Sequence, residues 1–264
     1  LLRCDMASSW EPVARLAKHK GISVMTRVSP VSIWVTLRHG LRLAGWAAVA
    51  SLWAAATAHA TCGDSPGPGV DWAGCAKQQL MLEGKDLSGA NFSGAFLSGA
   101  SLQGTNLQGT NFAGSELPRA AFVGANLAGT NFEKALASRA NFQDANLTKA
   151  NLFKAEFTRV SFVGANLAGA NMSDGGFHRN DFAGANLSGA NLTRAIVPRG
   201  VFKGANLTGT DFSQAFLYRS RFEGVDLTVA KGLTQHQLDE ACGDATTKLP
   251  DGITMPKLWP CGED

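Results

Sequence analysis

Large apolar residues recur at every fifth position from Leu82 to Leu227, and this spacing limits the possible fold more than any other feature of the sequence. Thirty consecutive units keep the same phase, and all but Ala137, Met172 and Val197 place Leu or Phe at the centre. A period of five matches neither the 3.6-residue repeat of a helix nor the two-residue repeat of a strand. The chain is therefore predicted to turn a corner once in every five residues.

Residue types also recur at a spacing of twenty. Phe stands at every twentieth position from Phe122 to Phe222, and Leu stands at every twentieth position from Leu87 to Leu227. Stacked coils bring like side chains into register, so four units are expected to make one coil. The sequence therefore predicts an all-β solenoid of square cross-section, with about seven coils that lie about 4.8 Å apart if their backbones pair as strands do.

Such a coil cannot be stable alone. It would bury four central side chains, each contributing roughly 1.5–3 kcal/mol. Ordering its twenty residues costs about 1–2 kcal/mol for each backbone unit. Stacking is therefore obligatory, and both ends of the stack need caps.

The units resemble the consensus of the pentapeptide repeat protein family, which is Ala, Asp or Asn, Leu or Phe, and two variable positions. The run Ala125-Asn126-Leu127-Ala128-Gly129 is an example, and the resemblance covers residues 82–229. It implies a right-handed quadrilateral β-helix of pentapeptide repeats, in which the small and the central residue point inward and the other three outward. With the features of the two ends, the chain is similar to bacterial, exported members of this family.

Two segments are predicted to cap the repeats. Residues 61–81, with two prolines and a tryptophan, should form the N-terminal cap, and residues 230–264 should form the C-terminal cap. In the latter, Thr234 and Gln237 match a capping box, which predicts a short capping helix at about 235–242. The sequence from Gln237 onward also resembles the tail of bacterial members of the family, and its simplest interpretation is structural.

Residues 1–60 are typical of a leader with a secretory signal peptide. Basic residues precede an apolar run at 43–58, and the triplet Ala58-His59-Ala60 matches a cleavage site. The run is shorter than the roughly 20 residues that a membrane-spanning helix needs, so cleavage after Ala60 is favoured over an uncleaved anchor. Met25 would give a signal of more usual length, which makes residues 1–24 a candidate over-extended start. Export predicts a periplasmic or secreted protein with no membrane span after cleavage.

Four cysteines flank the repeats, with Cys62 and Cys75 before them and Cys242 and Cys261 after them. Three pairings are possible. Because the repeat region should be rigid and long, each end is expected to close on itself, as Cys62 with Cys75 and Cys242 with Cys261. The alternative is four unpaired thiols in a cytosolic protein. The spacings, with no His nearby, fit no familiar zinc site.

The net charge of +3 gives no support for nucleic-acid binding, because the leader carries the excess. Seven of the 24 Lys and Arg residues and two of the 21 Asp and Glu residues lie in residues 1–60, so the remainder carries 17 basic and 19 acidic side chains. Its balance is −2. No nucleic-acid partner is therefore expected.

Candidate catalytic residues are few beyond the leader. The two histidines, His178 on a repeat face and His236 in the C-terminal cap, have no Cys, Asp or Glu at ligand or triad spacing, and no phosphate-binding loop is present. We therefore expect no catalytic site, cofactor or metal.

One surface feature is not required by the repeat. Arginines stand at twenty-residue spacing and should form a single outward column, the arginine column: Arg119, Arg139, Arg159, Arg179, Arg199 and Arg219. Glu116, Glu156 and Asp181 should neutralise part of its charge, whereas Arg221 should add to it. The column is either a by-product of duplication or a docking strip for an acidic protein segment or an anionic polymer.

The sequence thus favours a non-enzymatic, exported scaffold or binding protein, a rigid rod that presents a repeating surface with the arginine column to a partner. The family suggests an alternative, because some members resemble duplex DNA, bind type II topoisomerases and confer drug resistance. Such mimicry needs a dense acidic surface, which the balance of −2 does not supply. The sequence assigns neither the partner nor the oligomeric state.

Overall fold

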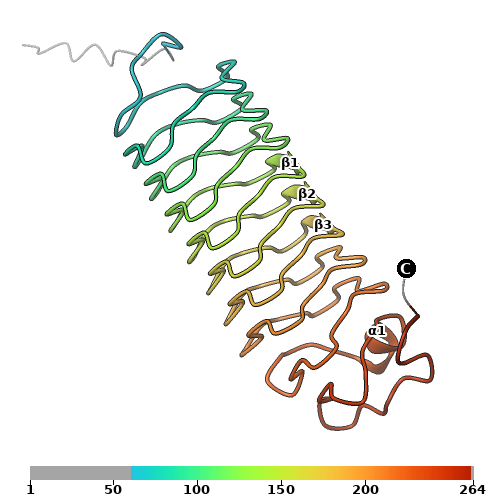
Figure 1. The fold of residues 1–264 in the computed structure, drawn as a ribbon. Helices are drawn as coiled ribbons and strands as arrows, with labels where there is room; N and C mark the ends of the chain where they lie inside the picture. The colour runs from blue at the N-terminus through green and yellow to red at the C-terminus, as the bar shows by residue number, and fades with distance from the viewer. Residues whose placement is uncertain (1–60, 263–264) are drawn as a thin grey trace, which may run out of the picture. The chain divides into compact units, whose positions relative to one another are not determined.

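The computed structural model describes residues 61–262, which form a β-helical solenoid (Figure 1). Parallel backbone bridges join residues twenty positions apart, as in Asn91 with Asn111 and Asn126 with Asn146. Two-residue turns recur at five-residue intervals. The four-sided coil of twenty residues is therefore confirmed within this part of the chain.

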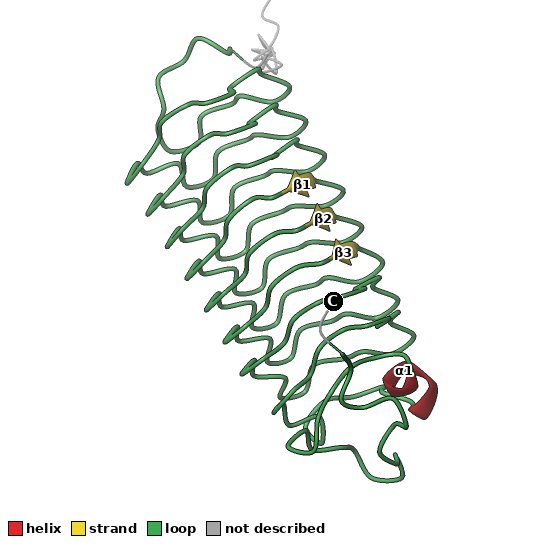
Figure 2. Ribbon diagram, turned by 45° about the vertical axis from the view of Figure 1, so that its right-hand side comes forward, coloured by secondary structure: helices red, strands yellow, loops and turns green. Residues whose placement is uncertain are grey.

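Most faces carry a single bridged residue, since a turn follows almost at once. Three successive coils carry longer strands on one face: β1 (Leu136–Ser138), β2 (Glu156–Thr158) and β3 (Gly176–His178). They pair in parallel in the order β1-β2-β3 and lie directly above one another (Figures 1 and 2). This face also carries the arginine column.

The core is a stack of the central residues. Leu87, Leu127 and Leu167 are completely buried, as are the phenylalanines of the neighbouring column. Rings one coil apart stack, with centroids 4.5 Å apart for Phe122 and Phe142. Burial of these side chains supplies the main favourable free energy of each added coil.

The corner residue two positions before the central residue is buried in most of the units. Alanine is frequent there, but threonine fits where its hydroxyl finds a carbonyl: Thr110 Oγ1 donates to the carbonyl of Leu87 at 3.1 Å, and Thr210 Oγ1 donates to that of Leu187 at 2.8 Å. Each bond joins a coil to the one before it. A buried hydroxyl with a partner costs little.

Two asparagine columns bond along the stack. Asn146 Nδ2 donates to Asn126 Oδ1 at 3.1 Å, and Asn151 Nδ2 donates to Asn131 Oδ1 at 3.0 Å. Each Oδ1 also accepts the amide N–H two residues later, as from Thr148 to Asn146. The asparagines therefore have a structural role, which links coils and closes turns.

The solenoid begins before residue 82, where the repeats were expected to start. Bridges already join Asp71 to Asn91, and Trp72 is buried in an edge-to-face contact with Phe92. The sequence hides this coil because Lys77 occupies a central slot. Its Nζ lies 3.8 Å from the Trp72 ring centroid and donates to the carbonyl of Cys62 at 2.7 Å. A lysine stem thus replaces a core side chain at the end of the stack.

A short helix, α1 (Gln235–Asp239), lies in the C-terminal segment and ends before the expected residue 242. Thr234 and Gln237 form the capping box. The Gln237 side chain is buried, and its Nε2 donates to the carbonyls of Phe212 at 2.9 Å and Ala215 at 2.8 Å. It therefore supplies donors to the last coil, where no further coil follows.

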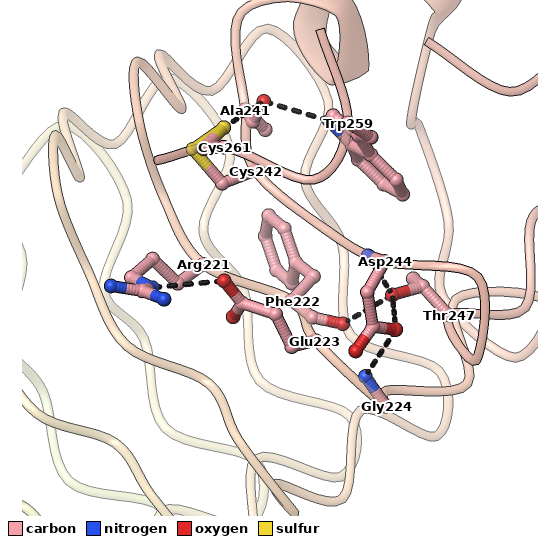
Figure 3. A network of polar contacts seen from close by, with 10 residues as sticks. All are labelled: Arg221, Phe222, Glu223, Gly224, Ala241, Cys242, Asp244, Thr247, Trp259 and Cys261. Carbon is pink, nitrogen blue, oxygen red and sulfur yellow. Dashed lines mark hydrogen bonds and ion pairs between the residues drawn. A yellow bond between two sulfur atoms is a disulfide. The ribbon is translucent and has the colours of Figure 1, made fainter. Parts of the chain in front are cut away.

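Further polar contacts hold the rest of this segment against the last coil (Figure 3). Thr247 Oγ1 donates to the carbonyl of Phe222 at 2.8 Å, and Asp244 accepts the amide N–H of Gly224 at 3.3 Å. Trp259 Nε1 donates to the carbonyl of Ala241 at 2.8 Å. The segment thus closes the exposed edge of the β-helix.

Two disulfides join the cysteines in the expected pairs, Cys62 with Cys75 and Cys242 with Cys261. Each closes one end of the described chain. The predicted leader, residues 1–60, lies outside the described residues. Within residues 61–262, no helix is both long and apolar enough to span a membrane.

Candidate functional site

The arginine column lies at one corner of the face that contains β1, β2 and β3. The amide N–H of Arg119 donates to the carbonyl of Ser138 at 2.8 Å, and that of Arg159 donates to the carbonyl of His178 at 2.8 Å. These bonds tie each arginine backbone to the next coil. The six side chains therefore follow one another along the rod, one for each coil.

All six arginines have a left-handed backbone, with φ between 55° and 58°. This region favours glycine, and an L-residue pays roughly 1–2 kcal/mol to adopt it. Glycine fills most equivalent corners of another face, such as Gly84, Gly104, Gly124, Gly164 and Gly184. A column of six arginines at such corners is therefore unfavourable for the backbone, and Lys134, Lys149 and Arg194 carry the same cost at corners of other faces.

This cost can be measured at Arg119, which follows Pro118 in a turn closed by a 3.1 Å bond from the Ala120 amide to the Leu117 carbonyl. We expect Arg119→Gly to raise the free energy of unfolding by about 1 kcal/mol, because glycine relieves the positive φ. Arg119→Ala keeps the strained backbone and should give no gain. Urea unfolding measures both, and equal effects of the two changes would show that the backbone is not strained.

An open groove of about 750 Å³ runs beside the column. Arg119, Arg139, Arg159 and Arg179 are exposed along it, and His178 is half-buried. Its other lining residues are small or polar: Ser98, Pro118, Ser138, Glu156 and Thr158. The structure thus brings four of the six predicted arginines into one site, called the arginine groove below.

The remaining two arginines lie further along the column and do not line the arginine groove. Arg199 and Arg219 are half-buried. Arg219 borders a separate pocket of about 440 Å³ at the C-terminal segment, and its amide N–H donates to the carbonyl of Glu240 at 2.7 Å. The described column therefore has two environments.

The opposite edge of the face has a different character. Bridges connect Phe96, Glu116, Leu136 and Glu156 in successive coils. Phe96 is 42% exposed and Leu136 is 46% exposed, so this column presents apolar surface between its glutamates. Neither was singled out from sequence, because the apolar period marks inward positions and says nothing about this outward column.

Gly176 leaves room for the side chains of Glu156 and His178, because it has no side chain of its own. A Cβ at Gly176 would collide with the Glu156 carboxylate and would lie 3.2 Å from Cε1 of His178. Glycine at this position therefore lets both groups lie over the β3 backbone. Spacing alone could not show this proximity, since it depends on one glycine in an otherwise bulky column.

The other charges predicted near the column have separate roles. Glu116 borders a small hollow of about 230 Å³ beside Leu136. Arg221 donates from Nε to Glu223 at 2.9 Å, so its charge is balanced locally. Asp181 accepts the amide N–H of Ala183 at 2.9 Å.

On the neighbouring face, the charge of Arg194 is neutralised by an ion pair with Asp174. Arg194 makes bonds of 2.7 Å and 2.6 Å to the two carboxylate oxygens of Asp174, and the hydrogen bond holds the pKa of Asp174 below its ordinary value. Within residues 61–262, no ion pair joins the four groove arginines to a carboxylate. Their guanidinium groups are therefore available to an anion from outside.

The groove has no arrangement suited to metal chemistry. Among the described residues, no group of three or more His, Cys, Asp or Glu side chains could hold a metal ion. His236 is exposed on α1, away from the groove lining. The arrangement can bind and orient an anionic ligand through several guanidinium groups.

A family model described as pentapeptide repeats matches the chain in eight copies, over residues 82–117, 115–152, 138–174, 161–197 and 185–228. These ranges together cover more than half of the 264 residues. No curated protein matches the chain.

Several solved structures are similar to the chain. HetL from the cyanobacterium Nostoc sp., a pentapeptide repeat protein involved in the regulation of heterocyst differentiation, is 24% identical over 71% of this chain and 87% of its own, with a TM-score of 0.43. A trypsin-treated variant of QnrB1, a plasmid-mediated fluoroquinolone resistance protein, is 17% identical over 70% of this chain and 90% of its own, with a TM-score of 0.42. A pentapeptide repeat protein of the Arabidopsis thaliana thylakoid lumen is 34% identical over 35% of this chain and 68% of its own, with a TM-score of 0.30.

Proposed function

Since the chain belongs to the pentapeptide repeat family of right-handed β-helices, we propose that it is a non-enzymatic, exported binding protein that presents the arginine groove to an anionic partner. The observation that carries this proposal is the line of four exposed arginines in the arginine groove, Arg119, Arg139, Arg159 and Arg179, for which residues 61–262 supply no carboxylate partner. Neither the core nor the coil-to-coil bonds need these side chains.

The arginine column lowers the stability of the fold in two ways, and this supports a role for it in binding. Guanidinium groups about 5 Å apart repel one another by roughly 1 kcal/mol in water, and salt and splayed side chains reduce this. The left-handed backbone adds its own cost at each corner. A bound polyanion would convert the repulsion into attraction, because each guanidinium offers several donors in a planar fork.

Export is the second part of the proposal. The leader pattern of residues 1–60 supports it, and so do the two cysteine pairs, because disulfides persist mainly in oxidising compartments. The oxidising periplasm or the extracellular space would keep both disulfides formed.

We expect protein recovered from the periplasm to begin at Thr61 and to gain the mass of four hydrogens on reduction. The reason is signal cleavage after Ala60 and the presence of two disulfides. Intact mass spectrometry with and without reductant measures both features. An unprocessed cytosolic chain with free thiols would contradict export.

The alternative function is that of a cytoplasmic DNA mimic that binds a type II topoisomerase and confers drug resistance. QnrB1, one of the similar structures, is a plasmid-mediated fluoroquinolone resistance protein. The arginine groove favours an anionic partner, and the balance of −2 beyond the leader is too small for the dense acidic surface that a DNA mimic needs. Location separates the two functions, because a periplasmic protein would not meet a cytoplasmic topoisomerase.

The binding role is tested by changing Arg119, Arg139, Arg159 and Arg179 to Gln together. We expect the melting temperature to stay the same or rise slightly, since like charges are removed at exposed positions. Cross-linked partners recovered from intact cells should be lost from the variant. The measurement is affinity capture followed by mass spectrometry.

A matched control removes the same charge elsewhere. Lys85, Lys149, Lys154 and Lys203 are exposed and lie outside the arginine groove, so their joint change to Gln should leave capture intact. An unchanged partner set in the arginine variant would overturn the proposed function. In that case duplication would account for the column.

A further inference from the structure

We propose that the arginine groove binds an extended acidic peptide segment that carries a carboxylate at every third residue, an inference that rests on the proposed function. The groove follows the rod axis, since it is lined by Ser98, Pro118, Ser138, Thr158 and His178 in five successive coils. Four coil intervals of about 4.8 Å give it a length of roughly 19 Å. A site of this form suits a narrow, linear ligand.

The two edges of the groove differ in charge, which disfavours a uniformly charged occupant. One edge carries four arginines, whereas Glu156 lines the groove from the other side. Beyond Glu156, a hollow lined by Glu116, Pro118 and Leu136 continues the same face. A polymer with negative charge on every side would meet these carboxylates at close range, at a cost of the order of 1 kcal/mol for each near pair in water.

A peptide can satisfy both edges because its side chains differ. Acidic side chains can point to the arginine edge, and apolar side chains can cover Leu136, which is 46% exposed. Burial of such apolar surface contributes about 25 cal/mol for each Å². The arginines of the groove and the apolar surface of the adjoining hollow together favour a protein segment over a polyanion.

The spacing of the arginines selects the conformation. In a β-strand, side chains on one side repeat at about 6.6 Å, which matches neither one coil nor two. A polyproline II chain places every third residue on one side at about 9.3 Å, close to two coils at about 9.6 Å. The four arginines of the groove span three coil intervals, about 14 Å, so two carboxylates at this spacing can face alternate arginines.

The groove surface also suits this conformation. A polyproline II chain has no internal hydrogen bonds, so its carbonyls remain free to accept from Ser138, Thr158 and the guanidinium groups that line the groove. Its stiffness lowers the entropy lost on binding. We therefore expect repeats of the type Glu-Pro-Leu to fit, with successive Glu residues facing alternate arginines.

The test uses fluorescence anisotropy at about 50 mM salt, where screening is weak. The probes are a labelled (Glu-Pro-Leu)3 peptide, a peptide of the same composition with its three Glu residues adjacent, and labelled heparin as a uniform polyanion. We expect the phased peptide to bind at least tenfold more tightly than the rearranged peptide. The four-arginine variant should lose this binding, and the four-lysine variant should keep it.

Leu136→Ser separates the peptide from a polyanion. It should weaken the phased peptide several-fold and leave heparin binding unchanged, because only the peptide covers Leu136. Glu156→Gln should strengthen heparin binding more than peptide binding. Both residues are outward, so neither change is expected to unfold the protein.

The outcomes distinguish the two proposals. If heparin binds through the four arginines and the two peptides bind equally, the peptide inference is overturned while an anion-binding function stands. If no probe binds and cellular capture is also unaffected by the four-arginine variant, both are overturned. Preference for the phased peptide, with loss in Leu136→Ser, supports the peptide segment.

Discussion

Replacing Leu167 by Asp is expected to unfold the rod or to lower its free energy of unfolding by about 4 kcal/mol or more. Leu167 is completely buried, between Leu147 and Leu187 of the adjacent coils. A carboxylate there would have no polar partner and no access to water, so the folded state would hold an unpaired charge or a strongly perturbed neutral acid. Such a loss is comparable to the whole stability of many domains, about 5–15 kcal/mol.

The matched control is Ala168→Asp, one residue along. Ala168 is partly exposed, and its outward position leads into solvent. The added carboxylate can stay hydrated, so we expect a change within about 0.5 kcal/mol. Thermal melts followed by circular dichroism compare the two variants. Equal losses would mean that the assignment of inward and outward positions is wrong.

The repeat was predictable because it depends on local periodicity. Every central position needs an apolar side chain, which gives the period of five. The phenylalanine and asparagine columns recur at twenty-residue spacing, which gives the length of one coil. The first coil was not predicted from the sequence, because Lys77 occupies a central position and interrupts the apolar pattern. Pattern recognition cannot tell an end coil, where a lysine stem can reach solvent, from a linker.

The candidate site was predictable only in part. The spacing of the arginines places them in one column, but their left-handed backbone follows from a turn type that the sequence shows mainly through the glycines at other corners. The acidic and apolar edge depends on outward side chains and on Gly176, which leaves room for Glu156 beside His178. Such proximity follows from side-chain volume in three dimensions, not from period.

Gln237 makes two of the buried hydrogen bonds that close the C-terminal end of the rod. In regular coils, the carbonyl at the corner accepts an amide N–H from the next coil, as Ala195 does from Phe216 at 2.9 Å. One coil after Ala215 the chain forms α1 (Gln235–Asp239), and there Gln237 Nε2 donates to the Ala215 carbonyl at 2.8 Å, in the place of a backbone donor from a further coil. One amide group therefore substitutes for part of a coil.

We expect Gln237→Leu to lower the free energy of unfolding by about 2–4 kcal/mol, because the buried carbonyls of Phe212 and Ala215 would lose this donor and the capping box with Thr234 would be broken. Urea unfolding measures the loss. His236→Leu is the control, since His236 is exposed on the same helix. Hydrogen exchange should place the damage in the last coils, because each coil contacts only its neighbours. Equal stability of the two variants, or protection lost evenly along the rod, would show that Gln237 does not close the β-helix.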